Sequence, residues 1–308
     1  PKAVDMASGS ATSGPPRDQN SEVAVVIEGV NKHFGSVHAL QGLNAHIRYG
    51  CLTGLVGPDG AGKTTLMRIL TGLLAPSSGH ATVAGFDVVD DNDAIHVATG
   101  YMPQRFGLYE DLSVMENMRL YAQLRGMDAD RNADLFAELL DFTRLAPFTG
   151  RLAGKLSGGM KQKLGLACAL MARPAVLLLD EPGVGVDPVS RQDLWRMVQA
   201  LTDEGMAVVW STAYLDEAER CDSVLLLNEG QLAYDGSPGE LTARLTNRSF
   251  RLERVGDRRR AVLAEALDLE SVSDGVIQGA GVRMVLRAHS GAEQITALAD
   301  RVEAHRPL

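Results

Sequence analysis

Short apolar runs alternate with longer amphipathic stretches along residues 23–240. Runs of apolar and β-branched residues between turn residues predict strands, and apolar positions near a 3.6-residue spacing predict helices. The predicted strands are 23–27, 38–47, 51–56, 81–83, 98–102, 175–181, 206–211, 223–227 and 232–234. The predicted helices are 63–70, 113–125, 129–142, 189–202 and 214–220. A further predicted helix begins within 155–163 and ends at 171. Several strands are apolar throughout, which is typical of a buried parallel sheet, so the pattern favours an α/β fold.

The same pattern divides the chain into three parts. Residues 1–21 are rich in Ser, Gly, Ala and Pro without periodicity and are expected to be disordered. Residues 22–245 form the α/β domain, in which helices dominate from about 105 to 170, and Ser113 with Glu116 predicts a capping box at the start of one of them.

Residues 246–308 show a different order of elements and predict a small α+β domain. Its strands are expected at 249–255, 275–278 and 282–287, and its helices at 259–267 and 292–304. The last helix has no evident stop signal, which favours a longer natural chain.

The composition narrows the class of protein. Hydrophobic residues make up 45% of the 308 residues, enough for a sizeable core. The net charge of −9 disfavours a nucleic-acid binder that relies on a generally basic surface. The three cysteines, Cys51, Cys168 and Cys221, lack the spacing of a metal site and suit a reducing compartment. No apolar run reaches the roughly 18 residues that predict a membrane span.

A glycine-rich stretch, Gly-Pro-Asp-Gly-Ala-Gly-Lys-Thr-Thr, lies between a predicted strand and a predicted helix. It fits the phosphate-binding loop pattern G-x-x-x-x-G-K-[ST]. Glycines let the backbone turn its N–H groups toward phosphates, and the helix N-terminus adds partial positive charge. Lys63 can reach the β- and γ-phosphates, and Thr64 can ligate Mg²⁺. The strand–loop–helix context disfavours the alternative of an ordinary glycine-rich turn. The residues expected to contact ATP here are Gly57, Pro58, Asp59, Gly60, Ala61, Gly62, Lys63, Thr64 and Thr65.

Two further motifs lie at the ends of predicted elements. Asp180 and Glu181 end the apolar strand 175–181, and a carboxylate pair there suits phosphoryl transfer beside a metal–phosphate centre. The alternative is two solvated acids. The run Leu-Ser-Gly-Gly-Met-Lys-Gln at 156–162 opens a helix in which Ser157 supplies a hydroxyl group, and Gly158 and Gly159 let the backbone approach an anion. The alternative is a capped helix start.

These motifs, in this order and at this spacing, resemble those of the nucleotide-binding subunit of ATP-binding-cassette (ABC) transporters. The resemblance covers about residues 23–240. It implies a P-loop NTPase fold of the ABC-ATPase type, in which an α/β core carries an antiparallel β subdomain and an inserted helical subdomain at about 105–170. It also implies ATP hydrolysis as the activity, with ATP and Mg²⁺ bound.

The resemblance assigns roles to residues around the phosphates. Asp180 would hold Mg²⁺ through water, with Thr64 and Gln104 as the other metal ligands. Glu181 would act as general base on the attacking water. Gln104, which touches both Mg²⁺ and water in the family, and Lys63 complete the implied catalytic set. A plain surface glutamine is the alternative for Gln104.

The resemblance also assigns roles outside the phosphate loop. Phe34 matches the aromatic residue that stacks on adenine, although a core phenylalanine is the alternative. Ser157, Gly158 and Gly159 would contact ATP held by the opposite subunit. Asp187 matches the aspartate of the family's D-loop, and the alternative of an ordinary helix N-cap before Pro188 is compatible with that role.

The chain departs from the family pattern at three positions. Ala213 stands where the family usually has a histidine after Ser-Thr, and a methyl group cannot bond the γ-phosphate or orient water. Tyr214 is adjacent, but along a strand its side chain would point the other way. Asp59 replaces the commoner asparagine, and Gly183 replaces a serine or threonine. Ala213 leads to the hypothesis that this site binds Mg-ATP but hydrolyses it weakly.

The signature run and the run from Thr212 to Arg220 give a narrower resemblance. Both resemble the first cassette of tandem ATPases linked to drug and sodium efflux, with the first cassette of ribosome-associated tandem ATPases close behind. The implied partners are a second cassette, paired head to tail and carried on the same native chain, and integral membrane permease subunits. The implied location is peripheral, on the cytoplasmic face of the inner membrane.

Two other functions of ABC-type ATPases are alternatives to drug export. In the alternative of a ribosome-associated ATPase acting in translation, Arg251, Arg254 and Arg258–Arg260 would contact phosphate, although a solvated face is the plainer interpretation. DNA is not an expected partner, because DNA-repair ATPases of this family carry long coiled coils between the phosphate loop and the signature. This chain shows no sustained heptads there.

Overall fold

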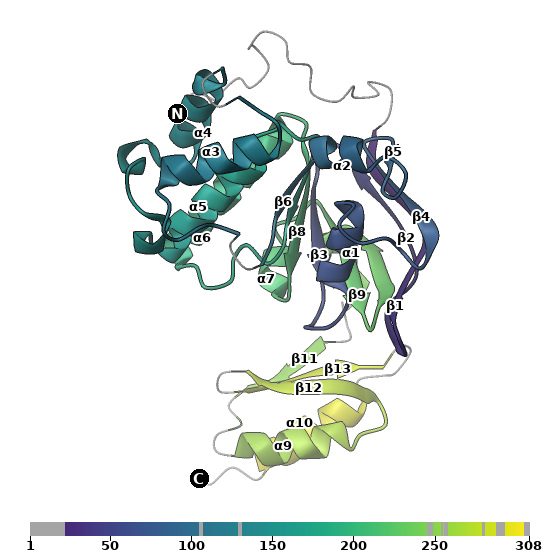
Figure 1. Ribbon diagram of the computed structural model, residues 1–308. Coiled ribbons are helices and arrows are strands. Elements are labelled where there is room, and N and C mark those ends of the chain that lie inside the picture. Colours follow the sequence, from purple (N-terminus) through teal and green to yellow (C-terminus); the bar gives the residue numbers. More distant parts are fainter. Residues whose placement is uncertain are drawn as a thin grey trace. The chain divides into compact units, whose positions relative to one another are not determined.

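The computed structural model describes residues 22–104, 107–128, 131–244, 249–253, 255, 258–278, 281–287 and 293–304. The chain forms two compact units that divide between Pro238 and Gly239 (Figure 1). The predicted disordered segment 1–21 and the predicted domain boundary at 245–246 lie outside the described residues. The structural division comes earlier than that boundary, because helix α8 (Pro238–Arg244) is grouped almost entirely with the second unit.

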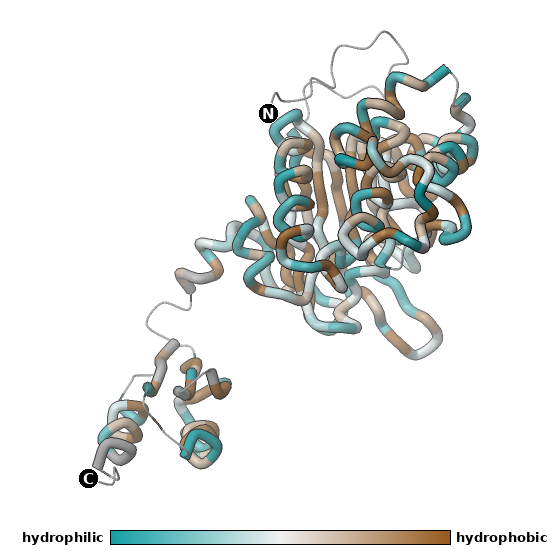
Figure 2. Tube along the Cα trace, turned by 90° about the vertical axis from the view of Figure 1, so that its left-hand side faces the viewer, coloured by the Kyte–Doolittle hydropathy of each residue, from teal (hydrophilic) through white to brown (hydrophobic). Residues whose placement is uncertain are grey.

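A six-stranded sheet forms the centre of the first unit. Its strand order is β10-β9-β3-β8-β7-β6, and all neighbours run parallel except β10, which pairs antiparallel with β9. The strands are β3 (Leu52–Val56), β6 (Thr99–Met102), β7 (Val176–Leu179), β8 (Ala207–Thr212), β9 (Ser223–Asn228) and β10 (Gln231–Gly236). Every residue of β3, β7 and β8 is buried, as expected for parallel strands covered on both faces. Figure 2 shows the hydrophobic residues of this unit gathered on its central strands.

A four-stranded antiparallel sheet with the order β2-β1-β4-β5 forms a second layer. Its strands are β1 (Val23–Phe34), β2 (Val37–Arg48), β4 (Ser78–Val83) and β5 (Phe86–Asp87). The prediction ended the first strand too early, at residue 27, because bulges between Ile27 and His33 break the alternation of apolar and polar positions. Helix α1 (Lys63–Leu70) lies between the two sheets (Figure 1). Its Leu66, Met67 and Ile69 share one core with residues of both layers.

Most of the remaining helices of the first unit gather beside the β6 edge of the six-stranded sheet, and the last of them contacts β3 and β8 instead (Figure 1). They are α2 (Asn92–Ala98), α3 (Val114–Leu124), α4 (Ala133–Phe142), the 3₁₀ turns Ala146–Phe148 and Ala153–Lys155, α5 (Gly158–Ala169), α6 (Pro188–Asp203) and α7 (Leu215–Ala218). The predicted capping box is confirmed, because Glu116 N donates to Ser113 Oγ at 3.3 Å and Ser113 N donates to Glu116 Oε2 at 2.8 Å. Helix α2 was not predicted, because it buries only Ile95 and Ala98.

The second unit is a small α+β body with its own core. Strands β11 (Ser249–Leu252), β13 (Gly281–Leu286) and β12 (Val272–Gln278) form an antiparallel sheet in that order. Helix α9 (Arg259–Leu267) matches its predicted range, and α10 (Glu293–Ala304) covers the described part of the predicted helix 292–304, since residue 292 lies outside the described residues. Val262, Met284 and Leu298 lie in its hydrophobic core. The predicted fold class is confirmed for both units.

Candidate nucleotide-binding site

The phosphate loop connects β3 to α1 and requires glycine at two positions. Gly62 has a φ of 105°, and a Cβ there would lie 2.6 Å from the carbonyl oxygen of Ala39. A Cβ at Gly57 would lie 2.3 Å from the carbonyl oxygen of Leu227. A side chain at either position would displace backbone, so the loop keeps its tight course only with these glycines. These contacts with the backbone of Ala39 and Leu227 fix the course of the loop, and a glycine-rich loop held between a strand and a helix is the arrangement of a phosphate cradle.

Lys63, the first residue of α1, turns its ammonium group back over the loop. Its Nζ donates to the carbonyl oxygens of Gly57 at 2.8 Å and Pro58 at 3.1 Å. The same nitrogen lies 3.3 Å from Glu181 Oε1, and Lys63 is only 5% exposed. The structure thus places a nearly buried positive charge between the loop and the end of β7.

Thr64 and Asp180 are joined directly although they are 116 positions apart in the chain. Thr64 Oγ1 donates to Asp180 Oδ2 at 2.8 Å, and Ser211 Oγ donates to Asp180 Oδ1 at 2.7 Å. Burial, together with the charge of Asp180, raises the pKa of Tyr101 to about 12, so this neighbouring hydroxyl group stays protonated. Asp180 is only 1% exposed, which excludes the alternative that it is a solvated acid.

The oxygen atoms of Thr64 and Asp180 also fit a magnesium ion. Within the described ranges no group of three or more His, Cys, Asp or Glu residues could hold a metal. Mg²⁺ does not need such a cage, because it usually takes one or two protein oxygens together with water and substrate phosphates. A hydroxyl and a carboxylate oxygen beside a phosphate loop are the donors that it prefers.

Glu181 follows β7 in a left-handed conformation, with a φ of 52°. Such a backbone costs a non-glycine residue roughly 1–2 kcal/mol and points to a constrained position. Ser211 Oγ accepts the Glu181 N–H at 2.8 Å. On the side chain, Gln104 Nε2 donates to Glu181 Oε2 at 2.7 Å, opposite the contact with Lys63. The structure therefore brings Lys63, Gln104 and Glu181 together as one connected group.

Ser211 was not singled out as a site residue from the sequence. It lies near the end of β8, the strand beside β7, and bonds both carboxylate residues that follow β7. Its neighbour Thr212 also contributes, because Gly57 N donates to the Thr212 carbonyl oxygen at 3.2 Å. The signal that could have found Ser211 is its place at the carboxyl end of a parallel strand, where ligand sites of open α/β sheets form.

Phe34 ends β1 with 51% of its surface exposed, so it is not a core residue. Its ring lies 5.2 Å from Lys32 Nζ, a cation–π distance. It belongs to the β1–β2 hairpin, whose Ala39 lies against Gly62 of the phosphate loop. The structure thus offers an exposed aromatic ring on the element next to the loop.

Ser157, Gly158 and Gly159 lie at the start of α5 and have other neighbours. Ser157 caps the helix by accepting the Met160 N–H at 3.3 Å. A Cβ at Gly158 would lie 2.9 Å from the Gly185 carbonyl oxygen, and one at Gly159 would lie 2.3 Å from Ser190. The nearest atoms to both glycines are therefore on the loop after Glu181 and on α6, not on the phosphate loop.

Asp187 is the N-cap of α6, as one interpretation of its sequence predicted. Its Oδ1 accepts the N–H groups of Val189 at 3.1 Å and Ser190 at 2.9 Å. Hydrogen bonds from Ser190 hold the pKa of Asp187 below its usual value.

Ala213 follows β8 and is exposed to solvent. The strand ends at Thr212, so the argument that Tyr214 points away along a strand does not apply; Tyr214 lies just before α7 and is 51% exposed. The histidines within the described residues belong to β1, β2, β4 and α2 rather than to the strand ends that carry Asp180 and Glu181. They are His33, His38, His46, His80 and His96.

Comparison with known proteins adds independent findings. A family model described as ABC transporter matches residues 40–184. The probable multidrug ABC transporter ATP-binding protein YbhF of Escherichia coli (strain K12) is 56% identical over 277 residues, which cover 89% of this chain and 48% of that protein. The chain therefore spans about half the length of this relative.

A second relative is matched over more of its own length. The daunorubicin resistance ATP-binding protein DrrA3 of Streptomyces coeruleorubidus is 36% identical over 247 residues, which cover 80% of this chain and 75% of that protein. Among solved structures, the dimeric post-hydrolysis state of the ATP-binding cassette MJ0796 with ADP and Pi has a TM-score of 0.63 and 25% identity. That match covers 70% of this chain and 98% of the solved one.

Proposed function

The chain belongs to the ATP-binding-cassette (ABC) family of transporter ATPases, and from this premise we propose that it is a drug exporter's cassette whose own ATP site turns over slowly. The observation that carries the proposal is the contrast at the site. Lys63, Thr64, Gln104, Asp180 and Glu181 form one connected group, while an exposed Ala213 follows the strand beside them.

Each residue of the group has a proposed task toward Mg-ATP. The Lys63 ammonium group, now held by two loop carbonyls and Glu181, pairs with the phosphates, which offer it stronger charge-assisted hydrogen bonds. Thr64 and Gln104 would hold Mg²⁺ directly, and Asp180 would hold it through water. When bound there, the ion would supply positive charge that offsets the charge developing on the phosphates. Phe34, from the hairpin next to the loop, stacks on adenine.

Glu181 is the proposed general base. Gln104 and Lys63 hold its two oxygens, and Ser211 fixes its backbone, so the carboxylate has a defined direction. It orients the attacking water and accepts its proton. Without an imidazole at 213, one contact to the transition state is missing, and loss of one such contact typically slows a reaction by about 10²–10³.

The partners follow from the family and from the names of the relatives. We place Ser157, Gly158 and Gly159 against ATP held by a second cassette in a head-to-tail pair. This chain covers 48% of the length of YbhF, and we place the second cassette on the same native chain because the rest of YbhF is long enough to hold one. The multidrug and daunorubicin names of the two relatives support amphiphilic drugs as cargo. Integral membrane subunits complete the exporter, with this chain peripheral on the cytoplasmic face of the inner membrane.

Two structural observations bear on the partners. None of the helices described is long and apolar enough to cross a membrane. The arginines considered for ribosome contact give little support to the alternative. Arg258 is 3.8 Å from Glu265, and Arg254 lies outside the described residues.

Affinity purification of the tagged protein from its native membranes separates the two functions. The expected result is co-purification with a multi-span membrane protein, together with drug export that is lost when Lys63 is replaced by alanine. Co-purification with ribosomes and no membrane subunit would contradict the export function and support the alternative.

A further inference from the structure

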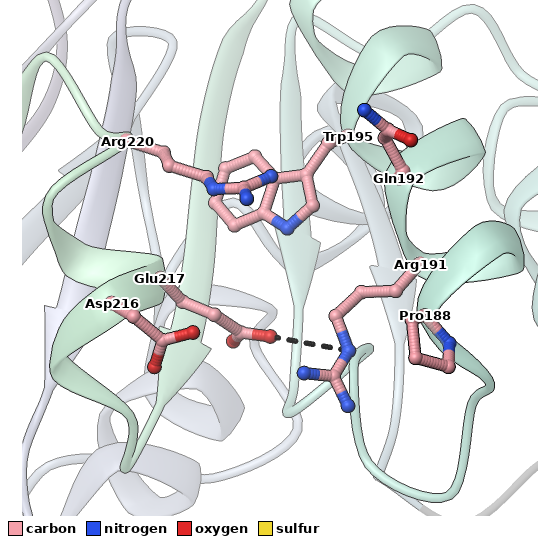
Figure 3. A pocket seen from close by; sticks show the side chains of 7 residues that line it. All are labelled: Pro188, Arg191, Gln192, Trp195, Asp216, Glu217 and Arg220. Carbon is pink, nitrogen blue, oxygen red and sulfur yellow. Dashed lines mark ion pairs between the residues drawn. The ribbon is translucent and has the colours of Figure 1, made fainter.

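Glu217 on α7 is a buried acid that none of the roles above uses. It is 3% exposed, and its Oε2 accepts the Trp210 indole N–H at 3.0 Å. Its other oxygen lies 3.8 Å from Nε of Arg191 on α6, as the dashed line in Figure 3 marks. The carboxylate thus joins α7 to β8 and to α6.

The same carboxylate fills a space that a side chain at residue 183 would need. A Cβ built on Gly183 would lie 2.4 Å from Glu217 Oε1. Gly183 follows Glu181 and Pro182 directly, in the turn that Val184 N closes by donating to the Glu181 carbonyl oxygen at 3.1 Å. Glu217 therefore contacts the start of the loop that leaves the proposed general base.

Arg191 holds the other end of that loop. Its guanidinium group donates to the Val186 carbonyl oxygen at 3.5 Å, one residue before Asp187. The pair of Glu217 and Arg191 consequently touches the loop 182–187 at both ends. The two residues come from α7 and α6, which Figure 3 shows on opposite sides of a cavity of about 300 Å³.

Two tryptophans lie next to the pair of Glu217 and Arg191. Trp195 and Trp210 stack with ring centroids 4.0 Å apart, and the Arg220 guanidinium group lies 5.6 Å from the Trp195 ring. Among the described residues, Glu217 Oε1 and Arg191 Nε are buried without a hydrogen-bond partner. Their 3.8 Å separation is an ion-pair distance that exceeds the reach of an N–H···O hydrogen bond.

We propose that Glu217 is a positioning residue for ATP hydrolysis. Together with Arg191 it acts as a brace, meaning that the two side chains fix the loop 182–187 against β8 and so hold Glu181 in its direction. Glycine at 183 makes room for this brace. The inference rests on the proposed role of Glu181. A misplacement of about 1 Å at a reacting group can cost as much as 100-fold in rate, so a brace on this loop matters for turnover.

The first test needs no nucleotide. Trp195 and Trp210 are the only tryptophans in the chain, so tryptophan fluorescence, excited selectively over tyrosine, reports on this cluster alone. Gly183→Ala adds a Cβ that pushes Oε1 of Glu217 away, and because the same carboxylate bonds Trp210 through Oε2, we expect a shifted emission maximum. Gly150→Ala is the matched control, because a Cβ there meets nothing within 4 Å. Emission of the Gly183→Ala protein identical to that of the wild type would overturn the contact on which the inference depends.

The second test measures single-turnover hydrolysis in the assembled complex with the partner cassette's site inactivated. Glu217→Gln keeps the size and the acceptor for Trp210 but removes the charge that faces Arg191. The expected result is a rate lower by about tenfold to 100-fold with ATP affinity unchanged. The double variant with Arg191→Gln should be no slower than the slower single variant, because both changes break one pair. Asp216→Asn, an exposed acid on the same helix, should leave the rate unchanged.

The outcomes separate this inference from the function on which it rests. If Glu217→Gln lowers only the melting temperature, while the ATP-bound protein hydrolyses at the wild-type rate, Glu217 is structural and the inference is wrong. Glu181→Gln serves as the reference. Normal hydrolysis by that variant would overturn the role of Glu181 itself, whereas an inactive Glu181→Gln beside a fully active Glu217→Gln would overturn the brace alone.

Discussion

Two neighbouring strands of the six-stranded sheet end in different ways. Strands β3 and β8 run parallel, and Val56 at the end of one lies beside Thr212 at the end of the other. After β3 comes a loop whose glycines and Lys63 are held in place by backbone contacts. After β8 comes Ala213, an exposed methyl group with no polar atom to offer.

The difference separates binding from turnover. The end of β3 carries Lys63 and Thr64, which would hold phosphate and metal. Strand β8 supports this loop through the Thr212 carbonyl group, and it supports Asp180, which follows β7, through Ser211. On the proposed function, what is missing after β8 is an imidazole that would contact the transition state. ATP held here would then serve mainly to keep two cassettes together, and the run Ser157–Gly159 would be this chain's larger contribution to hydrolysis, at the partner's ATP.

The largest effect is expected from removing the ammonium group after β3. Lys63→Ala should weaken Mg-ATP binding by about 100-fold or more, because each hydrogen bond to a charged group is worth about 1.5–3 kcal/mol and several are lost. Titration calorimetry with ATP and Mg²⁺ measures the dissociation constant. Arg151→Ala, at an exposed position, is the control and should bind normally. Unchanged affinity of the Lys63 variant would remove the phosphate loop from the account.

A smaller effect is expected at the exposed ring on the neighbouring hairpin. Phe34→Ala should weaken ATP binding by about tenfold, because base–aromatic stacking is worth about 1–3 kcal/mol. The hydrolysis rate of ATP that is already bound should not change. Val37→Ala is the matched control, since Val37 pairs with Phe34 across the hairpin and is 63% exposed. Equal affinities of the two variants would show that Phe34 does not contact the base.

The smallest effect is expected at Asp193, on α6 and outside both strand ends. Lys163 Nζ donates to its Oδ2 at 3.0 Å, and this contact is the main reason that the pKa of Asp193 lies below its usual value. Asp193→Asn should lower the free energy of unfolding by about 1 kcal/mol at pH 7, with ATP affinity unchanged.

The sign of its pH dependence follows from the lowered pKa. A carboxyl group whose pKa is lower in the folded chain stabilises the fold above its unfolded pKa, and that stabilisation is lost as the pH falls through the folded pKa. The difference between wild type and Asp193→Asn should therefore shrink below about pH 4. Urea unfolding at pH 7 and pH 3 measures it, and a difference that grows in acid would contradict the assignment.

Sequence patterns predicted the elements that carry strong periodicity or a motif. Helix α1 begins and ends at the predicted residues, and the capping box of Ser113 and Glu116 is confirmed. Short or irregular elements were missed, such as α2 and the second half of β1, because bulges and few apolar positions leave no clear period. These elements owe their form to the layers that they pack against.

The site shows the same division between local and long-range information. Motifs named the residues around the phosphate loop, because each motif is a short run in the chain. The bonds of Ser211 to Asp180 and Glu181, and the fit of Glu217 against Gly183, join segments about 30 residues apart or more. Only the strand order of the sheet and the packing of α7 bring them together, so no pattern within one segment reports them.

The most direct test of the slow-turnover claim restores the missing side chain. Single-turnover hydrolysis is measured for wild type and for Ala213→His in the assembled complex, with the partner cassette's site inactivated and Ala213→Leu as a control for size. The account predicts that wild type and Ala213→Leu turn over slowly and that Ala213→His gains at least tenfold, toward the roughly 10²–10³ that one transition-state contact supplies. Rapid turnover by wild type with no gain from the histidine would contradict it.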